Sequence, residues 1–182
     1  MDSARIKLHL GCGNVYLPGF VNVDINPGEA VDLVCDIRQL PHKANSVHEI
    51  YACAVLEHFG RHEWESVLAH WVSLLSKRGI IRISTTDFES CANHYIKHRD
   101  LSLLQGLLIG GQKDRWDWHG VVLDFEMLST ALKKLGLKKI KKYDWRDTIL
   151  YDLKIDDYSQ AYLPHMQKET GKLMVLNVEG QK

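Results

Sequence analysis

Two glycines and two aspartates follow apolar stretches near the start of the chain, with a spacing that suits a nucleoside-like ligand. Gly11 and Gly13 come directly after the apolar run at residues 8–10, Asp24 ends the next such run and Asp36 the one after it. Glycines let the backbone approach a ligand and adopt positive φ. A carboxylate at a strand end can accept hydrogen bonds from both ribose hydroxyls, and Asp36 could reach an adenine amine.

This spacing differs from the fingerprint of dinucleotide-binding folds. The position of the third glycine holds Tyr16, and Asp24 comes only 13 positions after Gly11, whereas the fingerprint places its acidic residue about 20 positions on. Too few residues remain for a full helix between the first two strands, which disfavours a pyrophosphate on a helix N-terminus. The pattern therefore favours an adenosine ligand without phosphate; the alternative is a tight turn with no ligand.

Three residues are candidates for acid–base chemistry, since histidine and aspartate are common general bases. His58 follows the fourth expected strand, Asp87 the fifth, and His119 lies in a loop between Trp116 and Gly120. Each has a structural alternative. Asp87 could be a helix N-cap, His58 could only shape the pocket, and the loop that carries His119 could use its tryptophans to cover the core.

The elements that must position these residues alternate between strand and helix. Short apolar runs predict strands at residues 6–10, 20–25, 31–37, 47–55, 80–84, 137–143 and 172–178. Amphipathic patterns predict helices at residues 61–77, from Asp87 towards His98, at 100–108 and at 125–135, the last with Asp124 as N-cap. No helix pattern separates the last two strands, so the last strand is free to pair antiparallel.

The helix expected at residues 61–77 has terminal signals as well as an apolar stripe. Lys77 and Arg78 suit the negative end of a helix dipole, and Gly79 suits the position just after the last turn. Alternating elements predict an α/β fold with a mainly parallel sheet. In such a sheet, ligands bind beyond the carboxyl ends of the strands, where the candidate residues named above are expected.

Composition predicts one globular domain over residues 1–182. Apolar residues make up 45% and charged residues 25%, and 23 basic residues balance 23 acidic ones. Zero net charge disfavours a broad nucleic-acid-binding face. The four cysteines fit no zinc-binding spacing, so no metal is expected. Met1 to Ile6 lacks the apolar core of a signal peptide, and no apolar run has transmembrane length. We therefore expect a cytoplasmic protein without a membrane partner.

Four motifs in this order resemble the class I S-adenosylmethionine-dependent methyltransferases, most closely the small methyltransferase type 11-like group. They are Leu10-Gly11-Cys12-Gly13-Asn14, Val23-Asp24-Ile25, Cys35-Asp36-Ile37 and Val55-Leu56-Glu57-His58. The resemblance implies a Rossmann-like, doubly wound, seven-stranded sheet whose last strand is antiparallel. The chain departs from most members of the group between Asn14 and Asn22, where they have a full helix.

The resemblance also implies a cofactor, S-adenosyl-L-methionine, with S-adenosyl-L-homocysteine as the product. The turn at Gly11, Cys12, Gly13 and Asn14 would pack on the methionine part of this cofactor. Asp24, followed by Ile25, would hold the ribose, and Asp36 with Ile37 would hold the adenine. Val55, Leu56, Glu57 and His58 would flank the methyl donor.

Two further segments carry patterns that could serve a partner. Residues 144–171 form a long connection whose Tyr151, Tyr158, Tyr162, Pro164 and His165 could be a substrate wall or a homodimer contact; the alternative is an excursion that covers the sheet edge. Lysines cluster at positions 133, 134, 138, 139, 141 and 142. A solvated sheet edge explains these lysines better than a nucleic-acid patch does.

The functional hypothesis is methyl transfer to a small molecule, with His119 taking the acceptor proton and His58 or Asp87 assisting. Some members of the resembling group build or decorate glycans, which makes a hydroxyl of a sugar, nucleotide sugar or glycan precursor the leading acceptor. Alternatives are methylation of nitrogen or carbon on another metabolite or an RNA base. A non-catalytic cofactor-binding module that acts through a partner also remains open.

Overall fold

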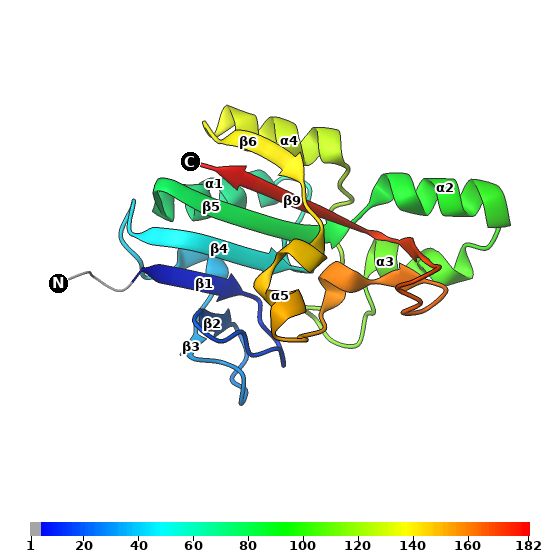
Figure 1. Cartoon of the computed structure of the whole chain (residues 1–182), viewed down its shortest axis with the longest axis horizontal. Helices are drawn as coiled ribbons and strands as arrows, with labels where there is room; N and C mark the ends of the chain where they lie inside the picture. The colour runs from blue at the N-terminus through cyan, green and yellow to red at the C-terminus, as the bar shows by residue number, and fades with distance from the viewer. Residues whose placement is uncertain (1–4) are drawn as a thin grey trace.

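A seven-stranded sheet forms the centre of the molecule in a computed structural model that describes residues 5–182 (Figure 1). Its strands are β1 (Ile6–Leu10), β2 (Val21–Asp24), β3 (Leu33–Val34), β4 (Val47–Cys53), β5 (Leu75–Thr86), β6 (Lys138–Lys142) and β9 (Val175–Gln181). A separate antiparallel pair joins β7 (Tyr162–Leu163) to β8 (Lys172–Leu173). Residues 1–4, part of the N-terminal stretch considered above for a leader, lie outside the described residues.

The strand order confirms the predicted doubly wound sheet. The strands run β3-β2-β1-β4-β5-β9-β6. β1 to β5 are parallel to one another, whereas β9 pairs antiparallel with both β5 and β6. The order reverses between β1 and β4, so the loops after these two strands lie at the switch point where ligands of open α/β sheets bind.

The helices agree with the sequence pattern except at three places, one of which is a short helix at residues 149–152 that no pattern predicted. They are α1 (Trp64–Leu74), α2 (Phe88–His98), α3 (Gln105–Ile109), α4 (Phe125–Lys134) and α5 (Ile149–Asp152). The predicted end of the first helix was wrong: Lys77, Arg78 and Gly79 belong to β5, which begins at Leu75. The helix expected at residues 100–108 is split into a 3₁₀ turn, η3 (Ser102–Leu104), and α3.

One face of the sheet, the back face, bears Leu8, Ile50 and Ile81 and is covered by α1 and α4 (Figure 1). The residues next to these in each strand point the other way because successive strand residues alternate between faces. α1 contributes Leu68 and Trp71, both fully buried in the same core. This dry layer supplies most of the apolar burial, as expected of helices packed on a parallel sheet.

The opposite face, the front face, bears a row of alternating charges across five strands. Lys7 pairs with Glu49 at 2.9 Å, Glu49 pairs with Arg82, Arg82 pairs with Glu179 at 3.1 Å, and Glu179 pairs with Lys141 at 3.2 Å. The side chains of the three central members are only 16–22% exposed. We call this row the charge ladder. It occupies sheet positions that helices would cover with apolar side chains in a fully layered α/β fold.

The remainder of the front face is covered by residues 144–173, which we call the cover segment. It contains η4 (Trp145–Asp147), α5, η5 (Tyr158–Gln160) and the β7–β8 pair, and α5 lies in front of the C-terminal end of β4 (Figure 1). Leu150 of α5 packs with Leu17, Phe20, Tyr51 and Cys53 in a small second core.

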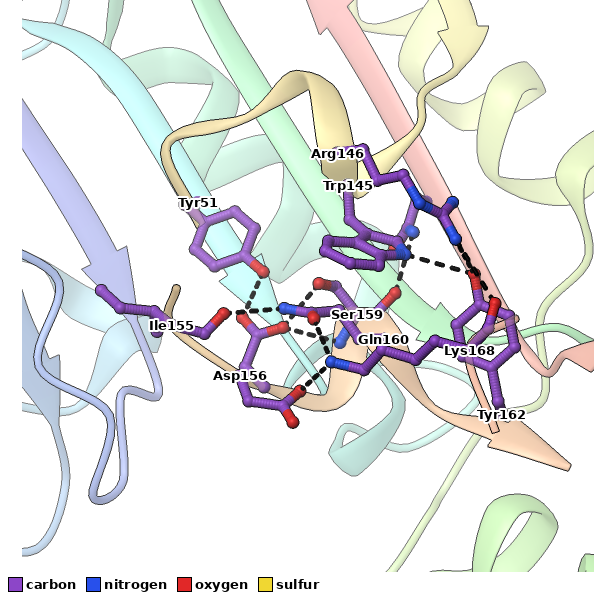
Figure 2. Close-up of polar contacts among 11 residues, drawn as sticks. Tyr51, Trp145, Arg146, Ile155, Asp156, Ser159, Gln160, Tyr162 and Lys168 are labelled. Atoms are coloured by element: carbon purple, nitrogen blue, oxygen red, sulfur yellow. Dashed lines mark hydrogen bonds and ion pairs between the residues drawn. The ribbon is translucent and has the colours of Figure 1, made fainter. Parts of the chain in front are cut away.

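Polar contacts hold the cover segment in place (Figure 2). The Tyr51 hydroxyl donates to an Asp157 carboxylate oxygen at 2.5 Å, and burial raises the pKa of Tyr51, which keeps this hydroxyl protonated. Lys168 binds Gln160 at 2.6 Å and Asp156 at 3.1 Å. The segment is therefore an ordered layer held by polar contacts together with the apolar packing of Leu150.

The lysine cluster lies at the sheet edge, as the solvated-edge interpretation predicts. β6 has only β9 as a neighbour, and its four lysines are exposed. Edge lysines discourage pairing with another sheet. Within residues 5–182, no helix combines the length and apolar character that crossing a membrane requires.

Candidate functional site

The loops after β1 and β4 touch at the switch point. Gly11 has φ +63°, and a Cβ placed on it would overlap the Val55 side chain. Gly13 has φ +52°, and a Cβ there would meet nothing within 4 Å. The first glycine is thus required by close packing against the loop after β4. The second borders open space where a ligand can approach the backbone.

Asp24 ties the glycine turn to the end of β2. One carboxylate oxygen accepts the Gly13 amide at 2.9 Å, and the other accepts the Asn26 amide at 2.9 Å. A carboxylate has about four lone-pair sites, so hydrogen-bond capacity remains for ligand hydroxyls. The sequence prediction that Gly13 and Asp24 lie together is met by this geometry, although their role stays a prediction.

Asp36 has a competing partner. Its carboxylate accepts the Arg38 amide at 3.0 Å and binds the Arg38 guanidinium at 2.6–2.9 Å. The hydrogen bonds to that guanidinium lower the pKa of Asp36. Asp36 also caps the 3₁₀ turn η1 (Ile37–Gln39). An adenine amine would therefore have to share this carboxylate with Arg38, which the sequence pattern did not reveal.

Other residues expected around a cofactor differ in how much they expose. Gly13 and Asn14 are exposed, and Ile25 and Ile37 are half-buried. Leu56 is fully buried in the back-face core, so its side chain cannot reach a ligand. Cys12 is buried too, and burial raises the pKa of its thiol to about 11, which keeps it neutral.

His58 joins two loops through both of its ring nitrogens. Nε2 lies 3.0 Å from the Ala54 carbonyl, and Nδ1 lies 3.1 Å from the Trp118 carbonyl. Carbonyls only accept hydrogen bonds, and a neutral imidazole has one N–H, so His58 donates to one of these carbonyls while its other nitrogen faces a carbonyl oxygen instead of open space. His58 therefore fixes the loop of residues 110–120 to the end of β4, and this geometry suits a positioning role better than a proton-accepting one.

His119 is arranged differently. Its Nδ1 lies 2.9 Å from the Leu107 carbonyl, so Nδ1 carries the proton of the neutral ring and Nε2 keeps a lone pair. Its ring meets the His58 ring edge-on, with centroids 4.9 Å apart. Burial lowers the pKa of His119 from its ordinary value of 6.5, and the nearby Glu57 partly opposes that shift. A neutral imidazole with one free nitrogen is the form a general base needs.

Asp87 serves as the N-cap of α2, as its structural alternative predicts. Its two oxygens accept the Glu89 amide at 3.1 Å and the Ser90 hydroxyl at 2.9 Å, and the residue is 7% exposed. The preceding Thr86 donates to the same Leu107 carbonyl that His119 contacts. The structure thus brings the end of β5 next to the His119 loop, while both Asp87 oxygens already hold partners.

Glu57, which the resemblance places beside the methyl donor, has an unusual environment. It is 2% exposed, and no described residue donates a hydrogen bond to its Oε2 atom. Its backbone carbonyl accepts the amides of Gly120 and Val121, which ties it to the His119 loop. A buried carboxylate oxygen without a hydrogen-bond donor is destabilising, and the sequence did not reveal this orphan atom. The role of Glu57 at a cofactor stays a prediction.

The loop of residues 110–120 is held open by one aspartate. Asp117 accepts the amides of Gly111 and Lys113 through its carboxylate, and that of Gln112 through its carbonyl. Trp116 and Trp118 are 37% and 54% exposed. The tryptophans are therefore exposed and do not cover the core, contrary to their structural alternative, although the Arg115 guanidinium lies 4.5 Å from the centre of the Trp116 ring.

Comparisons with known proteins give a match in structure but not in sequence. No family model matches the chain, and no curated protein does. A methyltransferase from Archaeoglobus fulgidus described as SAM-dependent superposes with a TM-score of 0.60 at 15% identity, over 100% of this chain and 87% of that one.

Two further structures superpose comparably. One is a Thermotoga maritima SAM-dependent methyltransferase described as a possible histamine N-methyltransferase (TM-score 0.61, 15% identity, 100% and 84% coverage). The other is the Burkholderia thailandensis 1,6-didemethyltoxoflavin-N1-methyltransferase with bound S-adenosylhomocysteine (TM-score 0.56, 14% identity, 98% and 72% coverage). Together with the strand order and the glycine turn at its switch point, these matches show that the chain has the fold of the class I SAM-dependent methyltransferases.

Proposed function

We propose that this chain transfers a methyl group from S-adenosyl-L-methionine to a hydroxyl of a small molecule, a sugar or a glycan precursor. The observation that carries the proposal is the hydrogen bond between the Gly13 amide and Asp24 at the switch point. It places an exposed glycine backbone and a carboxylate with spare lone pairs side by side. The open space beside Gly13 fits the methionine part of the cofactor, and Asp24 fits its ribose.

Methyl transfer to a hydroxyl requires the protein to align the hydroxyl with the methyl group and to supply one proton acceptor. When bound, S-adenosyl-L-methionine supplies a methyl group on positively charged sulfur, and the breaking carbon–sulfur bond leaves its electron pair on the sulfur. His119 Nε2 takes the hydroxyl proton as the acceptor oxygen bonds to the methyl carbon. His58 fixes the His119 loop to β4, and Asp87 fixes the start of α2. The exposed faces of Trp116 and Trp118 would stack on a sugar ring.

Calorimetric titration with S-adenosyl-L-homocysteine tests the cofactor assignment. We expect binding by the full chain and a loss of about 1–3 kcal/mol for Asp24→Ala, because the ribose hydroxyls lose a charged acceptor. Glu65→Ala, which removes an exposed carboxylate of α1, is the matched control and should bind as the unaltered chain does. Absence of binding at millimolar ligand would refute the cofactor assignment.

Turnover against a panel of nucleotide sugars and oligosaccharides, with a labelled methyl donor, tests the role of His119. His119→Gln should lower kcat by about 10²–10⁴-fold, the usual contribution of a general base. His98→Ala, on the surface of α2, should leave kcat unchanged. Because the pKa of His119 is lowered, kcat should be flat above neutral pH and fall on the acid side. Near-normal turnover by His119→Gln would show that another group takes the proton.

A further inference from the structure

A cavity of about 390 Å³ lies at the end of β6, where the cover segment meets the sheet. Its sheet side is lined by Asp87 after β5, Tyr143 after β6 and Asn177 of β9, and its other side includes Arg146 and Tyr162 of the cover segment. The volume falls within the range of small-molecule sites, about 300–1,000 Å³. The cavity is distinct from the glycine turn and does not include His119.

Asn177 lines this wall and has an unsatisfied acceptor beneath its surface. Its Nδ2 donates to the Ser159 carbonyl at 3.0 Å, while its Oδ1 receives no hydrogen bond from any residue of the described chain. Exchanging the two amide atoms would set two acceptors against each other, so the orientation is fixed by Ser159. Asn177 is 3% exposed. A buried acceptor left without a donor costs about 1–3 kcal/mol, which a ligand hydroxyl at this wall would recover.

The phenol of Tyr162 can donate a hydrogen bond at the same cavity. Its oxygen accepts the Trp145 indole N–H at 3.3 Å and an Arg146 N–H at 3.4 Å (Figure 2). With its lone pairs occupied, the remaining capacity of this phenol is its own O–H, which can donate. The cavity wall therefore contains an unsatisfied acceptor at Asn177, just beneath its surface, and a donor at Tyr162. A hydroxyl group, which donates and accepts, matches both.

The charges around the cavity cancel. Lys142 and Arg146 line it together with Asp87 and Asp144. Arg146 binds Asp144 at 3.1 Å, Lys142 lies 3.8 Å from Glu89, and both oxygens of Asp87 are occupied. A phosphate or carboxylate would have to displace these pairings. A neutral ligand with several hydroxyls leaves them in place.

The cavity adjoins the proposed methyl-transfer site at one point, the end of β5. Asp87 lines the cavity, and the adjacent Thr86 shares the Leu107 carbonyl with His119. His119 does not line the cavity, so a sugar unit bound in the cavity cannot place its own hydroxyl at His119. A second sugar unit, linked to the bound one, would place its hydroxyl there.

We infer that this cavity binds an uncharged sugar unit of the acceptor and recognises it through Asn177 and Tyr162. The inference rests on the proposed function for the statement that the bound molecule is then methylated. The binding itself does not depend on the cofactor. It makes the acceptor an oligosaccharide or glycoside of at least two units.

Nuclear magnetic resonance of the ¹⁵N-labelled full chain tests the assignment. The probes are methyl glycosides of glucose, mannose, galactose and N-acetylglucosamine at millimolar concentration, with methyl phosphate as the anionic probe. At least one glycoside should cause saturable shifts in the amides of Tyr143, Tyr162 and Asn177. Asn177→Leu should weaken this binding by about tenfold or more, the equivalent of one buried hydrogen bond. Lys142→Met should leave it within about twofold, because the charge of Lys142 is not used.

Tyr162→Phe is the second variant in case Asn177→Leu does not fold, and it should also weaken the glycoside. Shifts only with methyl phosphate, loss of binding in Lys142→Met, or no glycoside shifts at the cavity would each overturn the inference. The calorimetric titration with S-adenosyl-L-homocysteine separates the two proposals. Cofactor binding without glycoside binding removes the sugar site alone. Glycoside binding without cofactor binding removes methyl transfer and leaves the sugar site.

Discussion

The two faces of the sheet are built on different principles. The back face is a continuous apolar layer under α1 and α4, with Leu68 and Trp71 fully buried. The front face carries the charge ladder and a cover segment attached by polar contacts such as Tyr51 to Asp157. Burial of apolar area is the main favourable term in folding. The back face therefore provides stability, and the front face can vary without loss of the sheet.

The largest expected difference between the two faces is the loss of unfolding free energy when one buried leucine on each face is replaced by alanine. Leu68→Ala in α1 should cost about 2–5 kcal/mol of unfolding free energy, because it opens a cavity in the shared core. Leu150→Ala in α5 should cost less, since the cover segment can open locally while the sheet stays folded. Urea unfolding measures both, and hydrogen exchange locates the opening. Equal costs would mean that both faces unfold as one unit.

The charge ladder gives the next largest effect. Arg82→Met keeps the stem but leaves Glu49 and Glu179 half-buried without their shared cation, so we expect a loss of about 1–3 kcal/mol. Lys141→Met is the control. Its side chain is 66% exposed, and within residues 5–182 its ammonium pairs with Glu179 alone, so its removal should change stability by no more than about 0.5 kcal/mol. Similar values for both variants would show that the ladder is an ordinary surface ion-pair row.

The attachment of the cover segment is expected to be weaker. Tyr51→Phe removes only the hydroxyl that binds Asp157 and should cost about 1 kcal/mol, the net value of one hydrogen bond. Hydrogen exchange should become faster in residues 144–163 and stay unchanged in β4. Faster exchange throughout β4 would contradict an independently opening front layer.

The last expected effect is a pH dependence carried by His9 on the front face. Its Nδ1 donates to the Asn22 side chain at 2.9 Å, and burial lowers the pKa of His9 below its ordinary 6.5. Below pH 6.5 the unfolded chain binds a proton that the folded chain does not, so stability should fall as the pH falls. One proton limits the slope to about 1.4 kcal/mol per pH unit.

Urea unfolding between pH 5 and pH 7 measures this slope. His9→Gln should reduce it, whereas His62→Gln, at an exposed position, should leave it unchanged. Burial also lowers the pKa values of His42 and His119, so part of the slope should persist in the His9 variant. An unaltered slope in that variant would place the effect outside the front face.

Local patterns predicted the part of the molecule that local interactions build. The strands, the N-caps Asp87 and Asp124 and the proximity of Gly13 to Asp24 follow from short-range periodicity and turn chemistry. The end of the first helix was predicted wrongly because Lys77-Arg78-Gly79 matches the residue preferences of a helix C-terminus, although these residues lie in a strand that begins at Leu75. The pairing of this strand with β4 favours the strand over a longer helix.

The front face was not predictable in the same way. Tyr51 meets Asp157 across 106 positions, and Arg82 meets Glu179 across 97. A single sequence has no local signal for such pairs. The unpaired Oε2 of Glu57 and the use of the Leu107 carbonyl by both Thr86 and His119 depend equally on the assembled fold.

The late position of the cover segment in the chain has a consequence for synthesis on the ribosome. β1, β4 and β5 are complete by residue 86, whereas the residues that cover their front face are numbered 144–173. A growing chain therefore carries an uncovered sheet face while some sixty further residues are added, and exposed sheet surfaces are prone to aggregation. Lys7, Glu49 and Arg82 already lie on that face. These three members of the charge ladder give that face charged side chains before the cover segment is made.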